Sequence, residues 1–245
     1  MLAHLIQGKR GSAFGKENNL GIVIVDALRA SATATMLLHF GAIRILVVDE
    51  VDKALQLKTL FPDAMLFGER HGLPPAGFDY GNSPRETKYA RGREVIFTTT
   101  TGARLLFEGY SETIPFMIMA TTINANAVCQ FLKKQNKDFV IVPAGLYDDY
   151  NFPAQEDWTT ASYIISLLNI NICHGKEEYE YWEKRIEDDG IEKLFETAPH
   201  AEKLRKVGLS DDILWCAQVN ISATIPIATK KEQDYIVLEK FSKQK

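Results

Sequence analysis

Six short runs of apolar, largely β-branched residues alternate with stretches of helical periodicity along most of the chain. Within each run apolar residues follow one another directly, which is the pattern of strands that are covered on both faces. The expected strands are residues 21–25, 43–48, 64–67, 94–98, 116–119 and 139–142. The expected helices are residues 31–40, 51–60, 102–108, 124–135 and 156–168. This alternation predicts an α/β fold with a parallel or mostly parallel sheet and helices on both of its faces.

The last third of the chain has a different character. Residues from about 174 to 220 are charged and helical in pattern, and no linker-like segment separates them from the part before. We therefore expect one domain over residues 1–245, completed by this segment as a helical cap. Two apolar pieces follow, at residues 224–228 and 235–238, and we expect them to be strands at the edge of the sheet. Pro226 fits an edge or a strand start because proline cannot donate to a strand ladder.

The charge balance limits the partners of the chain. It carries 28 Lys and Arg against 32 Asp and Glu, a formal net charge of −4. Nucleic-acid phosphates are bound by clustered basic residues, so this balance argues against a generic nucleic-acid partner. No apolar run approaches the ~20 residues that cross a bilayer, and the N-terminus lacks the pattern of a secretory signal. We expect a cytoplasmic protein with no membrane partner, and the sequence leaves open whether it forms a homo-oligomer.

Cysteines and histidines show no metal-binding spacing. The three cysteines, at positions 129, 173 and 216, are not paired in the sequence. The five histidines, at positions 4, 39, 71, 174 and 200, lack any HxxxH-like pair. This pattern favours neither a zinc site nor a disulfide framework, and it is typical of a protein from a reducing compartment.

The segment after the first expected strand carries the first group of candidate site residues. Asp26 follows the strand directly, and Arg29 and Ser31 come next. A carboxylate at a strand end can hold magnesium or act as a nucleophile, and an arginine presents a fork of donors to phosphate oxygens. Ser31 lies at a helix start, where backbone N–H groups favour an anion. The same residues also suit an ordinary turn and N-cap, and this segment alone leaves both interpretations open.

The segments after the third and fourth expected strands carry similar groups. Residues 68–84 include four glycines and three prolines, a composition that suits close approach of the backbone to a polar ligand. Residues 98–104 open a helix with threonine hydroxyls and an arginine, although threonine also occurs in strands for its β-propensity. The candidates are Glu69, Arg70, Asn82, Ser83, Thr100, Thr101, Gly102 and Arg104. Because three strand ends combine donors with an arginine, we predict that they converge on one anionic ligand.

Two later helix starts add weaker candidates. Asn124 lies in a segment that repeats the threonine and amide pattern, and Glu156 and Asp157 open the helix that follows the last strand. Paired acids at a helix start are stabilised by the helix dipole, but they are also hard oxygen ligands that suit magnesium.

Together these segments resemble the 2-phosphosulfolactate phosphatase family. The residues that carry the resemblance read DALRASAT at 26–33, GERHG at 68–72, GFDYGNSP at 77–84, TTTTGAR at 98–104, NANAV at 124–128 and AG…ED at 144–157. The resemblance implies a magnesium-dependent phosphatase that hydrolyses (2R)-2-phospho-3-sulfolactate to 3-sulfolactate and phosphate, a step of coenzyme M biosynthesis. It also implies a three-layer α/β/α fold around a mixed sheet. Thr101 and Ala103 depart from the family pattern, which usually reads TTNGT. This departure bears on which substrate is used more than on whether the chain is a phosphatase.

The implied substrate carries phosphate, sulfonate and carboxylate groups. A chain with a net negative charge must therefore place basic side chains and a metal ion together at the binding site. We expect Mg²⁺ on Asp26 with Glu156 and Asp157, without choosing between the last two. Two routes remain open from the residues. In one, Asp26 attacks phosphorus as the nucleophile; in the other, a carboxylate such as Glu69 deprotonates a metal-bound water. The expected catalytic residues are Asp26, Arg29 and Glu69. The expected substrate-binding residues are Ser31, Arg70, Asn82, Ser83, Thr100, Thr101, Gly102, Arg104 and Asn124. A non-catalytic binder or sensor of an anionic metabolite is the alternative.

Overall fold

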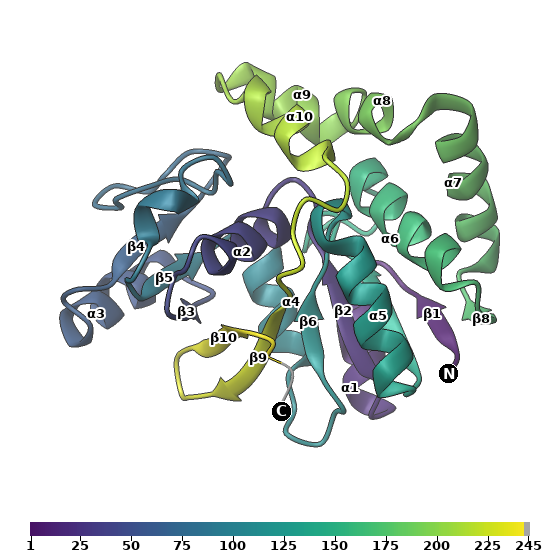
Figure 1. Cartoon of the computed structure of the whole chain (residues 1–245). Coiled ribbons are helices and arrows are strands. Elements are labelled where there is room, and N and C mark those ends of the chain that lie inside the picture. Colours follow the sequence, from purple (N-terminus) through teal and green to yellow (C-terminus); the bar gives the residue numbers. More distant parts are fainter. Residues whose placement is uncertain (243–245) are drawn as a thin grey trace.

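A ten-stranded sheet forms the centre of the computed structural model, which describes residues 1–242 (Figure 1). The strand order is β4-β5-β3-β10-β9-β6-β2-β7-β1-β8. The strands are β1 (Ala3–Leu5), β2 (Gly21–Val25), β3 (Ile45–Val47), β4 (Met65–Gly68), β5 (Val95–Thr98), β6 (Met117–Met119), β7 (Phe139–Pro143), β8 (Ile172–His174), β9 (Pro226–Lys231) and β10 (Ile236–Lys240). The six strands expected from the apolar runs are therefore confirmed, with shifts of one or two residues at some ends.

The sheet is mixed and mostly parallel, as expected. Strand β2 pairs in parallel with β6 and β7, and β5 pairs in parallel with β3 and β4. The hairpin of β9 and β10 is antiparallel to its neighbours and lies between β3 and β6. The expectation that these last strands form an edge is therefore wrong. Residues 236–238 are buried at consecutive positions, as in the other central strands, and Pro226 is the first residue of β9, where its missing N–H is tolerated.

Helices cover both faces of the sheet, which gives the expected three layers. They are α1 (Gly8–Glu17), α2 (Ala30–His39), α3 (Val51–Leu60), α4 (Gly102–Gly109), α5 (Ala125–Gln135), α6 (Gln155–Leu168), α7 (Lys176–Asp189), α8 (Ile191–Glu196), α9 (Pro199–Lys206) and α10 (Ser210–Ala217). Val23 and Ile141 belong to the apolar core shared with α5 and α6, and Ile22 and Val140 to the core shared with α2 and α4. Alternate residues of one strand thus face opposite cores, which explains its continuous apolar run.

Helix α1 was not expected from the sequence because its packing face is built from glycines. A Cβ atom at Gly11 would lie 2.0 Å from the carbonyl oxygen of Ile6. A Cβ atom at Gly15 would lie 2.6 Å from the side chain of Ile22 and 2.7 Å from that of Val140. These glycines let the helix lie close against the strands, but they lower its helix propensity and hide its apolar periodicity.

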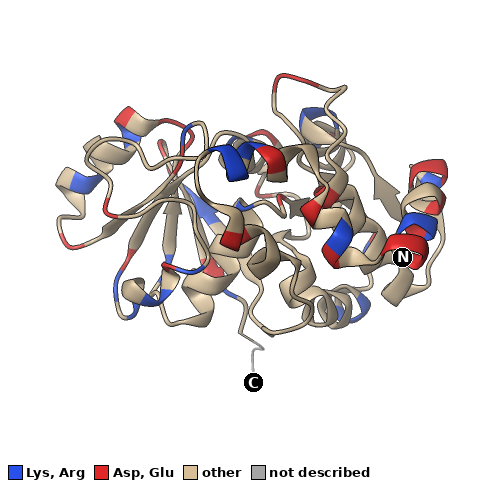
Figure 2. Ribbon diagram, turned by 90° about the horizontal axis from the view of Figure 1, so that it is seen from above, with Lys and Arg blue, Asp and Glu red and all other residues tan. Residues whose placement is uncertain are grey.

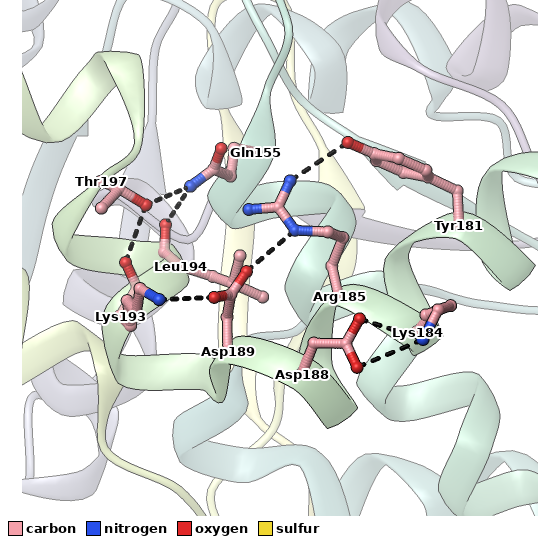
Figure 3. Close-up of polar contacts among 9 residues, drawn as sticks. All are labelled: Gln155, Tyr181, Lys184, Arg185, Asp188, Asp189, Lys193, Leu194 and Thr197. Carbon is pink, nitrogen blue, oxygen red and sulfur yellow. Dashed lines mark hydrogen bonds and ion pairs between the residues drawn. The ribbon is translucent and has the colours of Figure 1, made fainter.

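The charged segment after residue 174 forms the helices α7 to α10, which lie along the top and right of Figure 1. Figure 3 shows a polar network that joins α7, α8 and α6: Asp189 accepts hydrogen bonds from Arg185 at 3.0 Å and from Lys193 at 2.6 Å. Gln155, the first residue of α6, donates to the carbonyl oxygen of Leu194 at 2.6 Å. Among the described residues, no helix combines the length and the apolar character needed to cross a membrane.

Candidate functional site

A cavity of about 400 Å³ lies beyond the carboxyl ends of β2, β4, β5 and β7 and is covered by α9. This is where ligands bind in open α/β sheets. Six of the predicted site residues line the cavity: Asp26, Arg29, Glu69, Asn82, Thr100 and Thr101. The structure thus brings together side chains from three strand ends, as the sequence predicted.

Asp26 is fixed at the start of α2. Its Oδ1 atom accepts a hydrogen bond from the N–H of Ala30 at 3.1 Å, and a Cβ atom on Gly102 would lie 2.8 Å from Oδ2. Asp26 is 8% exposed. Burial is the main reason why its pKa rises to about 6, and the nearby carboxylates of Glu69 and Glu156 add to the rise while His200 opposes it. Asp26 therefore both accepts the first N–H of α2 and lines the cavity.

Glu69 connects the ends of β4 and β5. Its Oε1 atom accepts the N–H of Thr100 at 2.7 Å, and its Oε2 atom accepts the N–H of Gly72 at 2.9 Å. Burial raises the pKa of Glu69, but these hydrogen bonds outweigh burial and hold the pKa below its usual value. Glu69 is consequently an ionised group that orders two cavity-lining segments.

Arg29 lines the cavity but is already paired. Its guanidinium donates to the carboxylate of Asp212 in α10, and also to the carbonyl oxygen of Gly72 at 2.9 Å. The second carboxylate oxygen of Asp212 accepts the hydroxyl of Ser83 at 2.8 Å. The side chains of Arg29 and Asp212 are 2% and 1% exposed. This buried pair connects the segment after β2 to α10, and the hydrogen bond from Ser83 supports the pair.

His200 at the start of α9 is a cavity residue that the sequence reasoning missed. Its Nδ1 atom lies 3.1 Å from Oε1 of Glu156, which is fully buried. Burial lowers the pKa of His200, but the hydrogen bond and charge of Glu156, with the charge of Asp26, raise it above its usual value overall. The other oxygen of Glu156, Oε2, has no hydrogen-bond partner among residues 1–242. Glu156 thus lies behind His200 and is not part of the cavity lining.

Asp157 organises the backbone around the site. Its Oδ1 atom accepts the N–H of Ala27 at 2.7 Å, and its Oδ2 atom accepts the N–H of Gly145 at 2.9 Å. Burial, followed by the charges of Glu156 and Asp26, raises its pKa well above the usual value. Both oxygens are engaged in holding the ends of β2 and β7 together, so Asp157 acts as a positioning residue.

Several predicted substrate-binding residues do not line the cavity. The Ser31 hydroxyl is buried and accepts the N–H of Asp26 at 3.0 Å. Arg70 donates to Thr98 Oγ1 at 3.0 Å, and Arg104 lies 3.5 Å from Asp148 on the surface. Ser31 and Arg70 hold the chain next to the cavity, as Ser83 does. Gly102 leaves room for the carboxylate of Asp26, and Arg104 forms an exposed ion pair.

Asn124 is also a structural residue. It is fully buried, donates to the carbonyl oxygen of Thr224 at 2.9 Å and accepts the N–H of Thr121 at 3.0 Å. These bonds attach the chain before β9 to the start of α5. The buried Asn82 is different, because it lines the cavity and its Oδ1 atom has no hydrogen-bond partner within the described part of the chain.

The cavity holds two carboxylates that suit a magnesium ion, Asp26 and Glu69, and only Asp26 belongs to the predicted ligand set. Asp26, Glu156 and Asp157 do not form a group of ligand atoms within 4.8 Å of one another in the described part of the chain. Magnesium is commonly held by one or two carboxylates together with water and phosphate oxygens. Asp26 and Glu69 line the cavity and suit that role. The raised pKa of Asp26 favours a cation beside it, because a positive charge would offset the cost of the buried carboxylate.

The cavity also has a basic wall. Lys203 and Lys206 follow His200 at helical spacing on α9, and all three line the cavity. Basic and acidic positions are otherwise interspersed over the ribbon in Figure 2, in line with the small net charge. Lys203 lies 4.7 Å from the ring centroid of Phe152, and Lys206 pairs with Glu202 at 3.0 Å. Basic residues of α9 and carboxylates from the strand ends thus line one cavity, which suits a ligand with several negative charges.

Comparisons with known proteins show which family the chain resembles. The family described as 2-phosphosulpholactate phosphatase matches residues 12–231. A probable 2-phosphosulfolactate phosphatase of Carboxydothermus hydrogenoformans is 32% identical over 207 residues, 84% of each chain. Similar relatives come from Clostridium acetobutylicum, at 32% identity over 89% of this chain and 93% of the relative, and from Pseudothermotoga lettingae, at 34% over 84% and 88%.

Proposed function

The chain belongs to the 2-phosphosulpholactate phosphatase family, and we propose that it hydrolyses 2-phospho-3-sulfolactate to 3-sulfolactate and phosphate with the help of magnesium. The observation that carries the proposal is the meeting of Asp26 with the basic wall of α9 across one cavity. A site that only stored an anion would gain nothing from buried carboxylates beside it, whereas phosphoryl transfer uses them. The product would serve coenzyme M or sulfolactate biosynthesis, and the free thiols of the chain suit a cytoplasmic location.

Different residues of the cavity have different roles in this proposal. Asp26, which lines the cavity, acts as nucleophile or as metal ligand, and Glu69 is the second carboxylate available to a metal. When bound, magnesium would neutralise phosphate charge and help to position the attacking group. His200 is the proton donor for the oxygen that leaves phosphorus, because its pKa is raised and it faces the cavity. Lys203 and Lys206 hold the sulfonate and carboxylate.

The direct test is phosphate release from a panel of phosphorylated hydroxy acids, with and without magnesium. We expect turnover of 2-phospho-3-sulfolactate that chelation with EDTA abolishes and added Mg²⁺ restores. Full activity of a metal-free preparation would remove magnesium from the proposal. Binding of the sulfonated phosphate without any phosphate release would favour the non-catalytic sensor instead.

A second prediction concerns specificity for the sulfonate. The double variant Lys203→Ala, Lys206→Ala should raise KM for 2-phospho-3-sulfolactate by about tenfold or more. Each substitution removes a charged hydrogen-bonding partner of the substrate. The rise should be smaller for 2-phospholactate, which lacks the sulfonate. Lys184→Ala is the matched control, because this lysine lies on α7 and forms an exposed pair with Asp188. An equal rise in KM for both substrates would contradict sulfonate recognition by α9.

A further inference from the structure

Two histidines and a cysteine meet at the edge of the sheet formed by β1 and β8. The Nδ1 atoms of His4 and His174 lie 2.6 Å apart. These nitrogens and the sulfur of Cys173 form a group of possible ligand atoms within 4.8 Å of one another. None of the three residues lines the cavity described above, so the cluster is separate from the proposed phosphatase site.

A β-bulge creates this arrangement. Ala3 pairs with Ile172 and His4 pairs with His174, so Cys173 is an extra residue in β8. Neighbouring side chains of a regular strand point to opposite faces, but a bulge turns two successive residues toward one partner. The bulge thus allows Cys173 and His174 to approach His4 together.

The surroundings hold the cluster in place. The ring of Phe14 in α1 lies 5.1 Å from that of His4 and 5.4 Å from that of His174, between centroids. Gly175 follows at a φ of +77°, and a Cβ atom there would lie 2.3 Å from the carbonyl oxygen of Leu5. An aromatic ring supports the two imidazoles on one side, and a position that only glycine fits fixes the chain directly after them.

We propose that His4, Cys173 and His174 bind a borderline-soft divalent metal, with zinc as the best match. Two imidazole nitrogens and one thiolate are typical zinc ligands, and magnesium prefers oxygen. His4 is buried, whereas Cys173 and His174 are exposed, so a fourth position remains open to water or to a small ligand. Zinc–nitrogen bonds of about 2.0–2.1 Å in a tetrahedron separate two nitrogens by about 3.3 Å, and the exposed ring of His174 can move by that amount.

The spacing argument from the sequence does not detect this cluster. The two histidines are 170 positions apart, and the parallel pairing of β1 with β8 brings them together. Spacing rules detect ligands that come from one turn or one helix, but they do not detect ligands that come from two adjacent strands.

Cobalt is a suitable probe, because a bound thiolate gives a charge-transfer band and tetrahedral Co²⁺ gives strong visible absorption. We expect metal-free protein to bind one Co²⁺ with both features, and Zn²⁺ to displace it. Cys173→Ser should remove the charge-transfer band, and His174→Ala should weaken Co²⁺ binding by about tenfold to a hundredfold or more. Both variants should keep the magnesium-supported activity, because neither residue lines the cavity.

Two control variants separate this site from the others. His39→Ala removes an exposed histidine whose Nδ1 atom lies 3.0 Å from the hydroxyl of Ser222, and it should leave the cobalt spectrum unchanged. Asp26→Asn should leave the spectrum unchanged too, because Asp26 belongs to the cavity. A spectrum that survives Cys173→Ser, or that Asp26→Asn removes, would overturn the proposal. Absence of cobalt binding to the unaltered protein would also overturn it, and would leave His4 and His174 as a hydrogen-bonded pair only.

Discussion

Asp26→Asn is expected to lower phosphate release by about a thousandfold or more, equivalent to the loss of about 4 kcal/mol of transition-state stabilisation. Asparagine keeps the size of the side chain and the acceptor for the N–H of Ala30. It loses the charge and the nucleophilicity, which both proposed roles of Asp26 require. Steady-state turnover of the purified variant, measured with saturating magnesium, checks this expectation.

The stability of the same variant separates chemistry from folding. Because the pKa of Asp26 is raised to about 6 in the folded chain, its contribution to stability is fully present below its unfolded pKa and is lost as the pH rises through 6. Metal-free Asp26→Asn should therefore melt at a higher temperature than the unaltered protein at pH 7, and at a similar temperature near pH 4. The two melting curves at each pH provide the measurement.

A matched control removes a carboxylate at the opposite end of the sheet. Asp138 precedes β7 and accepts the N–H of Leu2 at 2.7 Å, so Asp138→Asn removes a similar charge far from the strand ends of the cavity. Its turnover should remain near normal. Near-normal turnover of Asp26→Asn with an intact fold would place the chemistry on another residue.

The central strands and their helices could be predicted because their signal is local. Residues 51–60 form α3 and residues 21–25 form β2 at the predicted bounds. The order of strands is not local. The β9–β10 hairpin lies between β3 and β6 because it pairs there with strands that are distant in the sequence. Its own sequence is compatible with edge strands as well as with central strands.

The lining of the cavity was predictable where its residues directly follow a strand. Asp26, Glu69 and Thr100 each lie within a few residues of a strand, and the parallel sheet brings such positions to one edge. The basic wall comes from a charged helix far along the chain, where the pattern alone indicates a solvent-exposed face. The spacing of His200 and Lys203 on one face of α9 was the available signal, but only the folded cap shows which face meets the cavity.

Asp212→Ala is expected to lower the free energy of unfolding by about 3–5 kcal/mol, because it leaves the guanidinium of Arg29 buried without its counter-charge. The side chains of this pair are 2% and 1% exposed. The carbonyl oxygen of Gly72 still accepts one hydrogen bond from Arg29, but it carries no charge. Urea denaturation of the variant and of the unaltered protein gives the difference directly.

The neighbouring residue supplies the matched control for this prediction. Asp211 forms an ion pair with Arg85 at 2.8 Å, and those side chains are 74% and 50% exposed. Asp211→Ala should therefore cost no more than about 1 kcal/mol, since exposed pairs are screened by water. The double variant Arg29→Met, Asp212→Leu should recover most of the lost stability, because apolar side chains of similar volume replace the whole pair. Equal losses of unfolding free energy for Asp211→Ala and Asp212→Ala would contradict this prediction. They would show that the buried Arg29–Asp212 pair does not determine how firmly α10 is attached to the segment after β2.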